Sequence, residues 1–230
     1  MTSGEHPPDD ALTLQVHRVS AEPQAADQYA ITLHTSRGDI AGVLHAREGL
    51  TAAVVWVGGA SGGLDGPADA IYPALGEALV KEGVASLRLD YRAPNHLVEC
   101  TLDALAGVSF LGGIGAESLG LVGHSFGGAV AIAAGVHSPS VKAVAALSSQ
   151  TYGATDVALL APRPLLLVHG LEDTRLPPAC SEQIFRWARQ PKDLVLIPGA
   201  GHGLRQCRQQ LFDLLKGWLV DKLRRRAEPP

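Results

Sequence analysis

The sequence has few cysteines and no metalloprotease motif, and each absence disfavours a class of protein. Its three cysteines, Cys100, Cys180 and Cys207, lie far apart and form no C-x-x-C pair, so we predict neither a disulfide scaffold nor a cysteine-based zinc site. Nine histidines include no H-E-x-x-H, which disfavours the helical zinc site of a metalloprotease. An odd number of widely spaced cysteines indicates reduced thiols.

Two further absences bear on location. No apolar stretch approaches the roughly 20 residues that a membrane-spanning helix needs. Residues 1–10 lack the basic segment and following apolar segment of a secretory signal. Together with the reduced thiols, these features predict a cytoplasmic protein without a membrane span.

The charge of the chain disfavours a polyanionic partner. The formal net charge is −4 and the pI is about 6.1, whereas nucleic-acid-binding domains usually show a basic face and a pI above ~9. The one basic cluster, at residues 222–226, fits the C-terminal end of a helix, where positive charge complements the helix dipole. We therefore expect no nucleic-acid partner.

Strand-like and helix-like segments alternate along the chain, which is typical of an α/β fold whose mostly parallel sheet is covered by helices on both faces. We predict one domain over residues 11–225, a disordered arm at 1–10 and a frayed tail at 226–230. The first three strands should form an antiparallel entry to the sheet. The predicted strands cover 12–19, 29–34, 39–45, 52–57, 84–89, 119–122, 141–147, 165–168 and 194–197, and the predicted helices cover 71–81, 96–110, 126–136, 181–189 and 204–223.

Residues 123–128 read Gly-His-Ser-Phe-Gly-Gly and join a predicted strand to a predicted helix. This G-x-S-x-G pattern is typical of a very tight turn that presents a serine hydroxyl at the edge of a sheet. The glycines leave room for the backbone and for the packed helix. Ser125 is therefore the predicted nucleophile, and we expect the adjacent His124 to line the pocket.

A serine hydroxyl needs a base within hydrogen-bond reach and a third group that holds the base in the right tautomer. The strand at 165–168 leads into a turn that places Asp173 at the carboxyl edge of the sheet as the predicted acid, with Asp156 as the weaker alternative. The last strand leads into a glycine-rich loop that carries His202, the predicted base. His169, at the end of its strand, is expected to be a core residue.

The strand at 52–57 ends in Gly-Gly-Ala-Ser-Gly-Gly, residues 58–63. Backbone N–H groups in such a loop can stabilise the oxyanion that forms when a serine attacks an acyl carbon. We predict the N–H of Ala60 as one donor, with Gly59 as the alternative, and the N–H of Phe126 as the other donor. No Gly-Lys-Ser/Thr follows, so a phosphate-binding P-loop is not supported.

Three segments together resemble α/β-hydrolases of the dienelactone-hydrolase-like and acyl-esterase kind. They are the serine motif at 123–127, the stretch from 161 to 165 that leads into 169–173, and Gly-Ala-Gly-His at 199–202. The resemblance spans about residues 39–223 and implies an eight-strand hydrolase sheet, a Ser–Asp–His triad and an ester-like substrate. Two positions depart from the pattern: dienelactone hydrolases proper carry cysteine where this chain has Ser125, and many esterases show His-Gly where it has Gly58-Gly59.

The motifs predict a serine hydrolase that cleaves an ester-like acyl bond of a small or soluble substrate through an acyl-enzyme on Ser125, without a cofactor or a metal. A thioesterase, a peptidase or an acyltransferase would use the same triad. A hydrolase-fold binding protein with little turnover is an alternative from another class. The oligomeric state stays open.

Two further expectations concern the surroundings of the site. The segment between the strands at 141–147 and 165–168 is short for a helical lid, so the site should be open, and Tyr152, Leu159 and Leu160 are candidates for a small rim. Arg92 follows another central strand and could bind a substrate carboxylate, although an ion pair with Asp90 or Asp103 is the more common arrangement.

Overall fold

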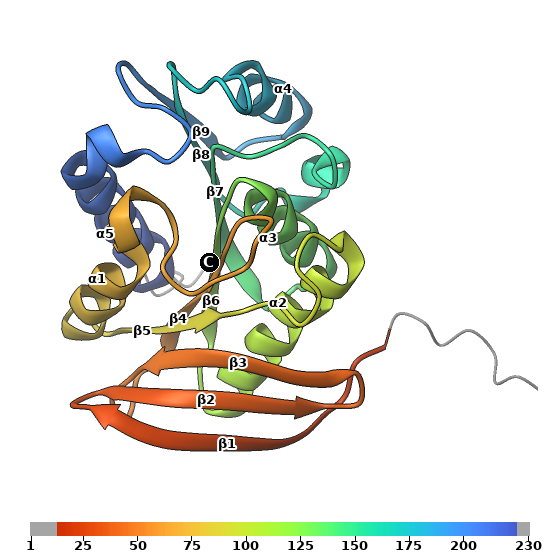
Figure 1. Ribbon diagram of the computed structural model, residues 1–230, viewed down its shortest axis with the longest axis vertical. Coiled ribbons are helices and arrows are strands. Elements are labelled where there is room, and N and C mark those ends of the chain that lie inside the picture. Colours follow the sequence, from red (N-terminus) through yellow and green to blue (C-terminus); the bar gives the residue numbers. More distant parts are fainter. Residues whose placement is uncertain (1–12, 225–230) are drawn as a thin grey trace, which may run out of the picture.

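The computed structural model describes residues 13–224, so the predicted arm at 1–10 and tail at 226–230 lie outside the described residues. Within this range nine strands form one sheet in the order β1-β2-β3-β5-β4-β6-β7-β8-β9 (Figure 1). The strands are β1 (Val16–Ala25), β2 (Gln28–Thr35), β3 (Gly38–His45), β4 (Ala52–Val57), β5 (Val84–Leu89), β6 (Ser118–His124), β7 (Val141–Leu147), β8 (Leu165–Gly170) and β9 (Lys192–Ile197).

The described chain also contains five α-helices and two short 3-10 helices, of which η2 and α5 follow the last strand. They are α1 (Pro67–Lys81), α2 (Leu97–Gly113), α3 (Phe126–His137), α4 (Ala179–Trp187) and α5 (Arg208–Arg224), with η1 (Thr155–Leu160) and η2 (Arg205–Cys207). Helices α1 and α5 cover one face of the sheet, and α2, α3 and α4 cover the other (Figure 1). The predicted α/β fold class is confirmed.

The sheet has an antiparallel edge and a parallel centre. Strands β1, β2, β3 and β5 pair antiparallel in that order, and all pairs from β5 through β4 to β9 are parallel. The antiparallel entry predicted from the sequence is therefore confirmed. The eight strands implied by the family resemblance are one too few, because β1 pairs along nearly its whole length with β2 and widens the sheet.

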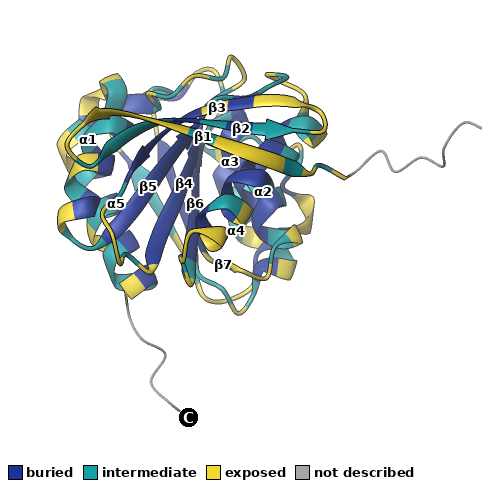
Figure 2. Ribbon diagram, turned by 90° about the horizontal axis from the view of Figure 1, so that it is seen from below, coloured by how far each residue is buried: buried dark blue, intermediate teal, exposed yellow. Residues whose placement is uncertain are grey.

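Every residue of β4, β5 and β8 is buried, as expected for strands covered on both faces (Figure 2). On the α1 and α5 side, Trp56 packs on Tyr72 with ring centroids 4.8 Å apart. Helix α5 contributes leucines at four-residue intervals from Leu211 to Leu223, all buried, which is the periodicity of one helix face. This packing holds the carboxyl ends of the central strands in fixed positions.

The helix boundaries differ from prediction where the backbone turns. Helix α1 begins at Pro67, but Ala68 to Ala70 have left-handed dihedrals, so its regular part begins at Ile71, the predicted start. The predicted closing helix at 204–223 is divided into η2 and α5, and no helix begins at Leu204 because that residue lies in the left-handed region with φ 53°. No helix among residues 13–224 is both long and apolar enough to cross a bilayer.

Candidate active site

Ser125 lies at the junction of β6 and α3, with φ 60° and ψ −121°, a region that non-glycine residues rarely occupy. Two glycines make this turn sterically possible. A Cβ on Gly123 would overlap the carbonyl oxygen of Gly127, and a Cβ on Gly127 would overlap that of Gly58. The chain therefore bends as tightly as the serine motif predicts, and the bend brings α3 against the loop that follows β4.

The structure brings together the three side chains predicted as a triad. His202 Nε2 lies 3.0 Å from Ser125 Oγ, and His202 Nδ1 lies 2.8 Å from Asp173 Oδ2. Because a carboxylate only accepts hydrogen bonds, Nδ1 carries the proton and Nε2 is left to accept from the serine hydroxyl. This is the tautomer that a base acting on Ser125 requires.

The carboxylate of Asp173 is fully enclosed, with a side chain that is 0% exposed. Its Oδ1 accepts hydrogen bonds from the backbone N–H groups of Arg175 and Leu176, each at 2.9 Å. Burial by itself opposes ionisation, but the N–H of Leu176, the imidazole of His202 and the N–H of Arg175 outweigh it, so the pKa of Asp173 is lowered. The group facing His202 is therefore a carboxylate anion. The alternative acid, Asp156, is exposed on η1, and the position it would need beside His202 Nδ1 is occupied by Asp173.

His169 has a polar contact that sequence reasoning missed. It is buried, as expected for a core residue, but its Nε2 lies 3.1 Å from Asp173 Oδ2. The sequence signal was available, since His169 and Asp173 are four residues apart at the end of one strand.

His124 lies beside His202, the predicted base. Its Nε2 donates to the backbone carbonyl of His202 at 2.9 Å, and the centroids of the two imidazole rings are 4.9 Å apart. Burial lowers the pKa of His124 to about 4, so the ring is neutral near pH 7 with its proton on Nε2. The contact ties the serine turn to the loop that carries the base.

The loop after β4 passes near the start of α3 (Figure 1). A Cβ built on Gly59 would lie 3.8 Å from the Cβ of Ser125, and the next residue, Ala60, is exposed. At the start of α3, the N–H groups of the first turn have no acceptor within the helix, and Phe126 is the first residue of that helix. The predicted donors therefore stay candidates on both sides of Ser125.

The residues that hold this loop were also missed from the sequence. The N–H of Gly63 donates to Asp90 Oδ1 at 2.7 Å, and the hydroxyl of Tyr91 donates to the carbonyl of Gly58 at 3.0 Å. Both residues follow β5, the strand beside β4. A carboxylate and a phenol at the end of a neighbouring parallel strand thus fix the backbone in which oxyanion donors would lie.

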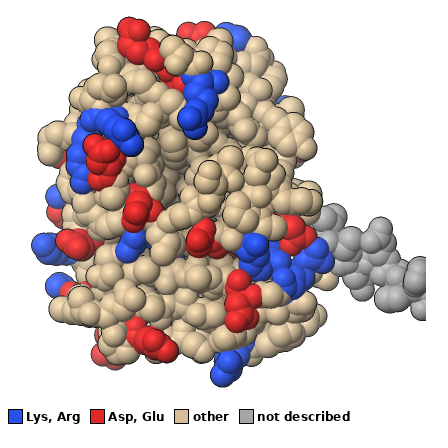
Figure 3. Space-filling model, viewed as in Figure 1, with Lys and Arg blue, Asp and Glu red and all other residues tan. Residues whose placement is uncertain are grey.

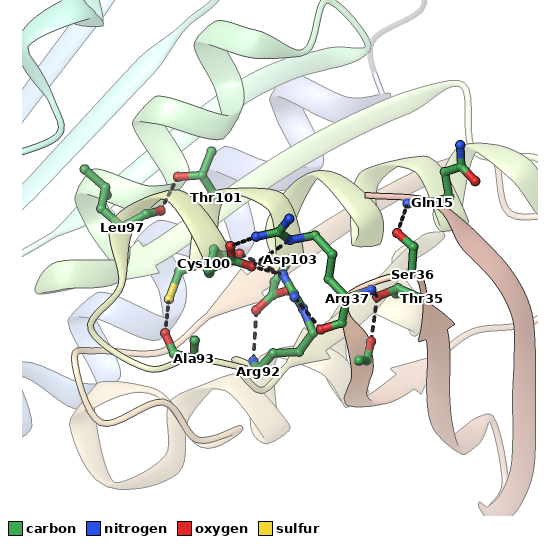
Figure 4. A network of polar contacts seen from close by, with 12 residues as sticks. Gln15, Thr35, Ser36, Arg37, Arg92, Ala93, Leu97, Cys100, Thr101 and Asp103 are labelled. Carbon is green, nitrogen blue, oxygen red and sulfur yellow. Dashed lines mark hydrogen bonds and ion pairs between the residues drawn. The ribbon is translucent and has the colours of Figure 1, made fainter. Parts of the chain in front are cut away.

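The guanidinium of Arg92 is bound by side chains and a carbonyl of the protein itself and is not free to bind a substrate (Figure 4). Its Nε donates to Asp103 and its Nη2 lies 3.0 Å from Glu99 Oε2. Its Nη1 donates to the carbonyl of Arg37 at 2.9 Å. The Arg92 side chain is 7% exposed and that of Asp103 is 0% exposed. Of the two alternatives that the sequence left open, the structure shows the ion pair with Asp103.

The connection from β7 to β8 carries η1 as its one short helix, so its described residues form no large helical lid. Of the three rim candidates, Tyr152 and Leu159 are 72% and 63% exposed, whereas Leu160 is buried and belongs to the core.

On the face of the molecule seen in Figure 1, charged side chains of both signs form small separate clusters (Figure 3). Among residues 13–224, no group of three or more His, Cys, Asp or Glu side chains is arranged to hold a metal ion.

Comparisons with known proteins bear on the fold. No protein-family model matches the chain. A segment of 50 residues is 42% identical to the uncharacterized protein YfhR of Escherichia coli K12; it makes up 22% of this chain and 18% of that protein, so the match spans a small part of both.

Solved structures match over much more of the chain. A dienelactone hydrolase from Anabaena variabilis superposes with a TM-score of 0.76 over 86% of this chain and 98% of its own, at 21% identity. The chain has the α/β-hydrolase fold. Est1E from Butyrivibrio proteoclasticus shares this fold with a TM-score of 0.74, 18% identity and coverage of 84% and 98%. An esterase domain from Rhodothermus marinus matches with a TM-score of 0.68 at 21% identity, over 84% and 98%. The similarity to dienelactone hydrolase inferred from the sequence motifs is thus confirmed at the level of the fold.

Proposed function

We propose that this α/β-hydrolase-fold protein is a serine hydrolase that cleaves an ester-like acyl bond of a small or soluble substrate through an acyl-enzyme on Ser125. The observation that carries the proposal is the continuous hydrogen-bonded chain from Ser125 Oγ through His202 to Asp173, with distances of 3.0 and 2.8 Å. The solved neighbours named as a dienelactone hydrolase and as an esterase support a hydrolytic reaction.

In the proposed reaction, His202 Nε2 takes the proton of the Ser125 hydroxyl while the oxygen attacks the acyl carbon. The N–H groups of Ala60 and Phe126 stabilise the resulting oxyanion, an interaction that can contribute ~2.7–4 kcal/mol per donor. The Nε2 proton then passes to the leaving group, which departs and leaves the acyl group esterified to Ser125. A water molecule then gives a proton to His202 Nε2 and attacks the ester carbon. As the acid is released, His202 passes this proton to Ser125 Oγ, which restores the serine hydroxyl and the neutral base. Throughout, Asp173 stabilises the imidazolium that forms on His202.

A thioesterase, a peptidase or an acyltransferase would use the same triad with another leaving group or acceptor. We favour an ester because the motifs and the named neighbours point to it, and a small or soluble substrate because a short connection rather than a helical lid lies between β7 and β8. A binding protein with little turnover would not need a base held in its productive tautomer.

The experiment is turnover of a panel of short and long acyl esters and thioesters by the wild type and by Ser125→Ala. The variant should retain the fold and lose ester turnover to the uncatalysed background. Ser109→Ala, an exposed serine on α2, is the matched control and should keep full activity. Undiminished turnover in Ser125→Ala would refute the proposal, and a preference for thioesters would move it to the first alternative.

A further inference from the structure

One oxygen atom of Asp173 binds two imidazoles. Oδ2 lies 2.8 Å from Nδ1 of His202 and 3.1 Å from Nε2 of His169. His169 lies in β8, one residue before the end of the strand, and is 0% exposed. The reaction proposed above uses His202 and assigns nothing to His169.

The hydrogen bonds of His169 show that its Nε2 carries a proton. Nε2 also lies 2.9 Å from the carbonyl oxygen of Leu176, and both of its partners are acceptors, so Nε2 is a donor. On the other side of the ring, Nδ1 lies 2.6 Å from Ser181 Oγ in α4. Ser181, also 0% exposed, is therefore the hydrogen-bond partner of the ring on the side away from Asp173. The imidazole is held at both ends between a central strand and a helix.

We infer that His169 is a positioning residue for the acid of the triad: its Nε2–H holds Asp173 Oδ2 toward His202 and ties the Asp173–Leu176 turn to β8. This inference rests on the proposed function, because it assigns Asp173 the role of orienting the base. Both oxygens of Asp173 are then fixed. Oδ1 is bound by the N–H groups of Arg175 and Leu176, and Oδ2 lies between two imidazoles. Rotation of the carboxylate away from His202 would break contacts on both sides.

A matched pair of variants isolates the donor. In His169→Gln the side-chain amide nitrogen is separated from Cβ by the same number of bonds as Nε2 and can still donate to Asp173. His169→Met has a similar length and no donor. We expect kcat of the Met variant to fall about 10- to 100-fold, as is typical when a hydrogen bond that orients an active-site group is lost. KM should change little, and the Gln variant should retain most of the wild-type kcat.

Ser181→Ala is the control for the far side of the ring, since it removes the hydroxyl from Nδ1 and leaves the contact with Asp173. Its kcat should lie near that of the Gln variant. Thermal unfolding of each variant establishes that it is folded, so that its kcat can be compared with that of the wild type. If the Met variant does not fold, His169→Asn replaces it, because the shorter amide cannot reach Asp173.

Equal kcat values for the Gln and the donor-free variant, both folded, would overturn the role of His169 while leaving the proposed function intact. Full activity in Ser125→Ala, measured in the same assay, would overturn the proposed function and this inference with it. A loss in kcat for the donor-free variant that Gln restores, together with an inactive Ser125→Ala, supports both.

Discussion

Replacing Asp173 by Asn is expected to reduce kcat by about 10⁴-fold, the order seen when the acid of a serine triad becomes an amide. The reason lies in the four donors that surround the carboxylate. Two backbone N–H groups face Oδ1 and two imidazole nitrogens face Oδ2. An amide oxygen can satisfy one pair, and its NH₂ group then meets the other pair of donors. With NH₂ toward His202, the imidazole must accept at Nδ1, so its proton moves to Nε2 and Ser125 loses its base.

At 1.36 kcal/mol per factor of ten, this loss corresponds to about 5 kcal/mol of transition-state stabilisation. The assay is steady-state hydrolysis of a short acyl ester, with kcat and KM determined separately. The matched control is Asp156→Asn, since Asp156 is exposed on η1, and it should leave kcat unchanged. Retention of more than a tenth of the wild-type kcat by Asp173→Asn, or a large loss in Asp156→Asn, would refute the assignment of the acid.

Three further predictions concern stability and packing. Burial lowers the pKa of His124 from 6.5 to about 4, so between these pH values the native state binds fewer protons at His124 than the unfolded chain does. The unfolding free energy of the wild type should therefore rise with pH through this window, and the rise should be about 3 kcal/mol smaller in His124→Gln. Urea titrations at several pH values measure this rise, and equal pH slopes for the two proteins would contradict the prediction. Arg92→Ala leaves the buried charge of Asp103 without its partner and should lower the unfolding free energy by about 3–5 kcal/mol. Its KM should change equally for carboxylate-bearing and neutral esters, and a selective rise for the former would revive a substrate role. Gly127→Ala inserts a methyl group against the loop after β4. Because overpacking costs ~1–3 kcal/mol, this variant should have a lower thermal midpoint and lower ester turnover. An unchanged midpoint would show that α3 does not approach this loop closely.

Local patterns were sufficient to predict most of the strands and helices, and to select the three side chains that the structure brings into hydrogen-bond contact, Ser125, Asp173 and His202. The apolar run at 52–57 coincides with β4 because a strand buried on both faces needs apolar residues at every position. Ser125 and His202 could be predicted from short stretches of sequence, because the tight turn and the glycine-rich loop are each encoded by consecutive residues. The parallel sheet then brings the carboxyl ends of β6, β8 and β9 to one edge, where these three side chains meet.

Contacts between distant segments were beyond the reach of these patterns. The hydrogen bond from Gly63 to Asp90 depends on β5 lying beside β4 in the sheet order, which the sequence does not specify. The environment of Arg92 required knowing that α2 places Asp103 and Glu99 beside it. The place of His169 at the end of a strand predicts a core residue, but a buried imidazole also needs hydrogen-bond partners, and one of them is Asp173.

The most direct test of a base-activated serine is covalent labelling of the intact protein with a fluorophosphonate, followed by mass determination and peptide mapping. We expect one adduct per chain, located on Ser125, and little labelling of His202→Ala under the same conditions, because the hydroxyl then has no base. An unlabelled wild-type protein, or an adduct mapped to a serine other than Ser125, would contradict the account.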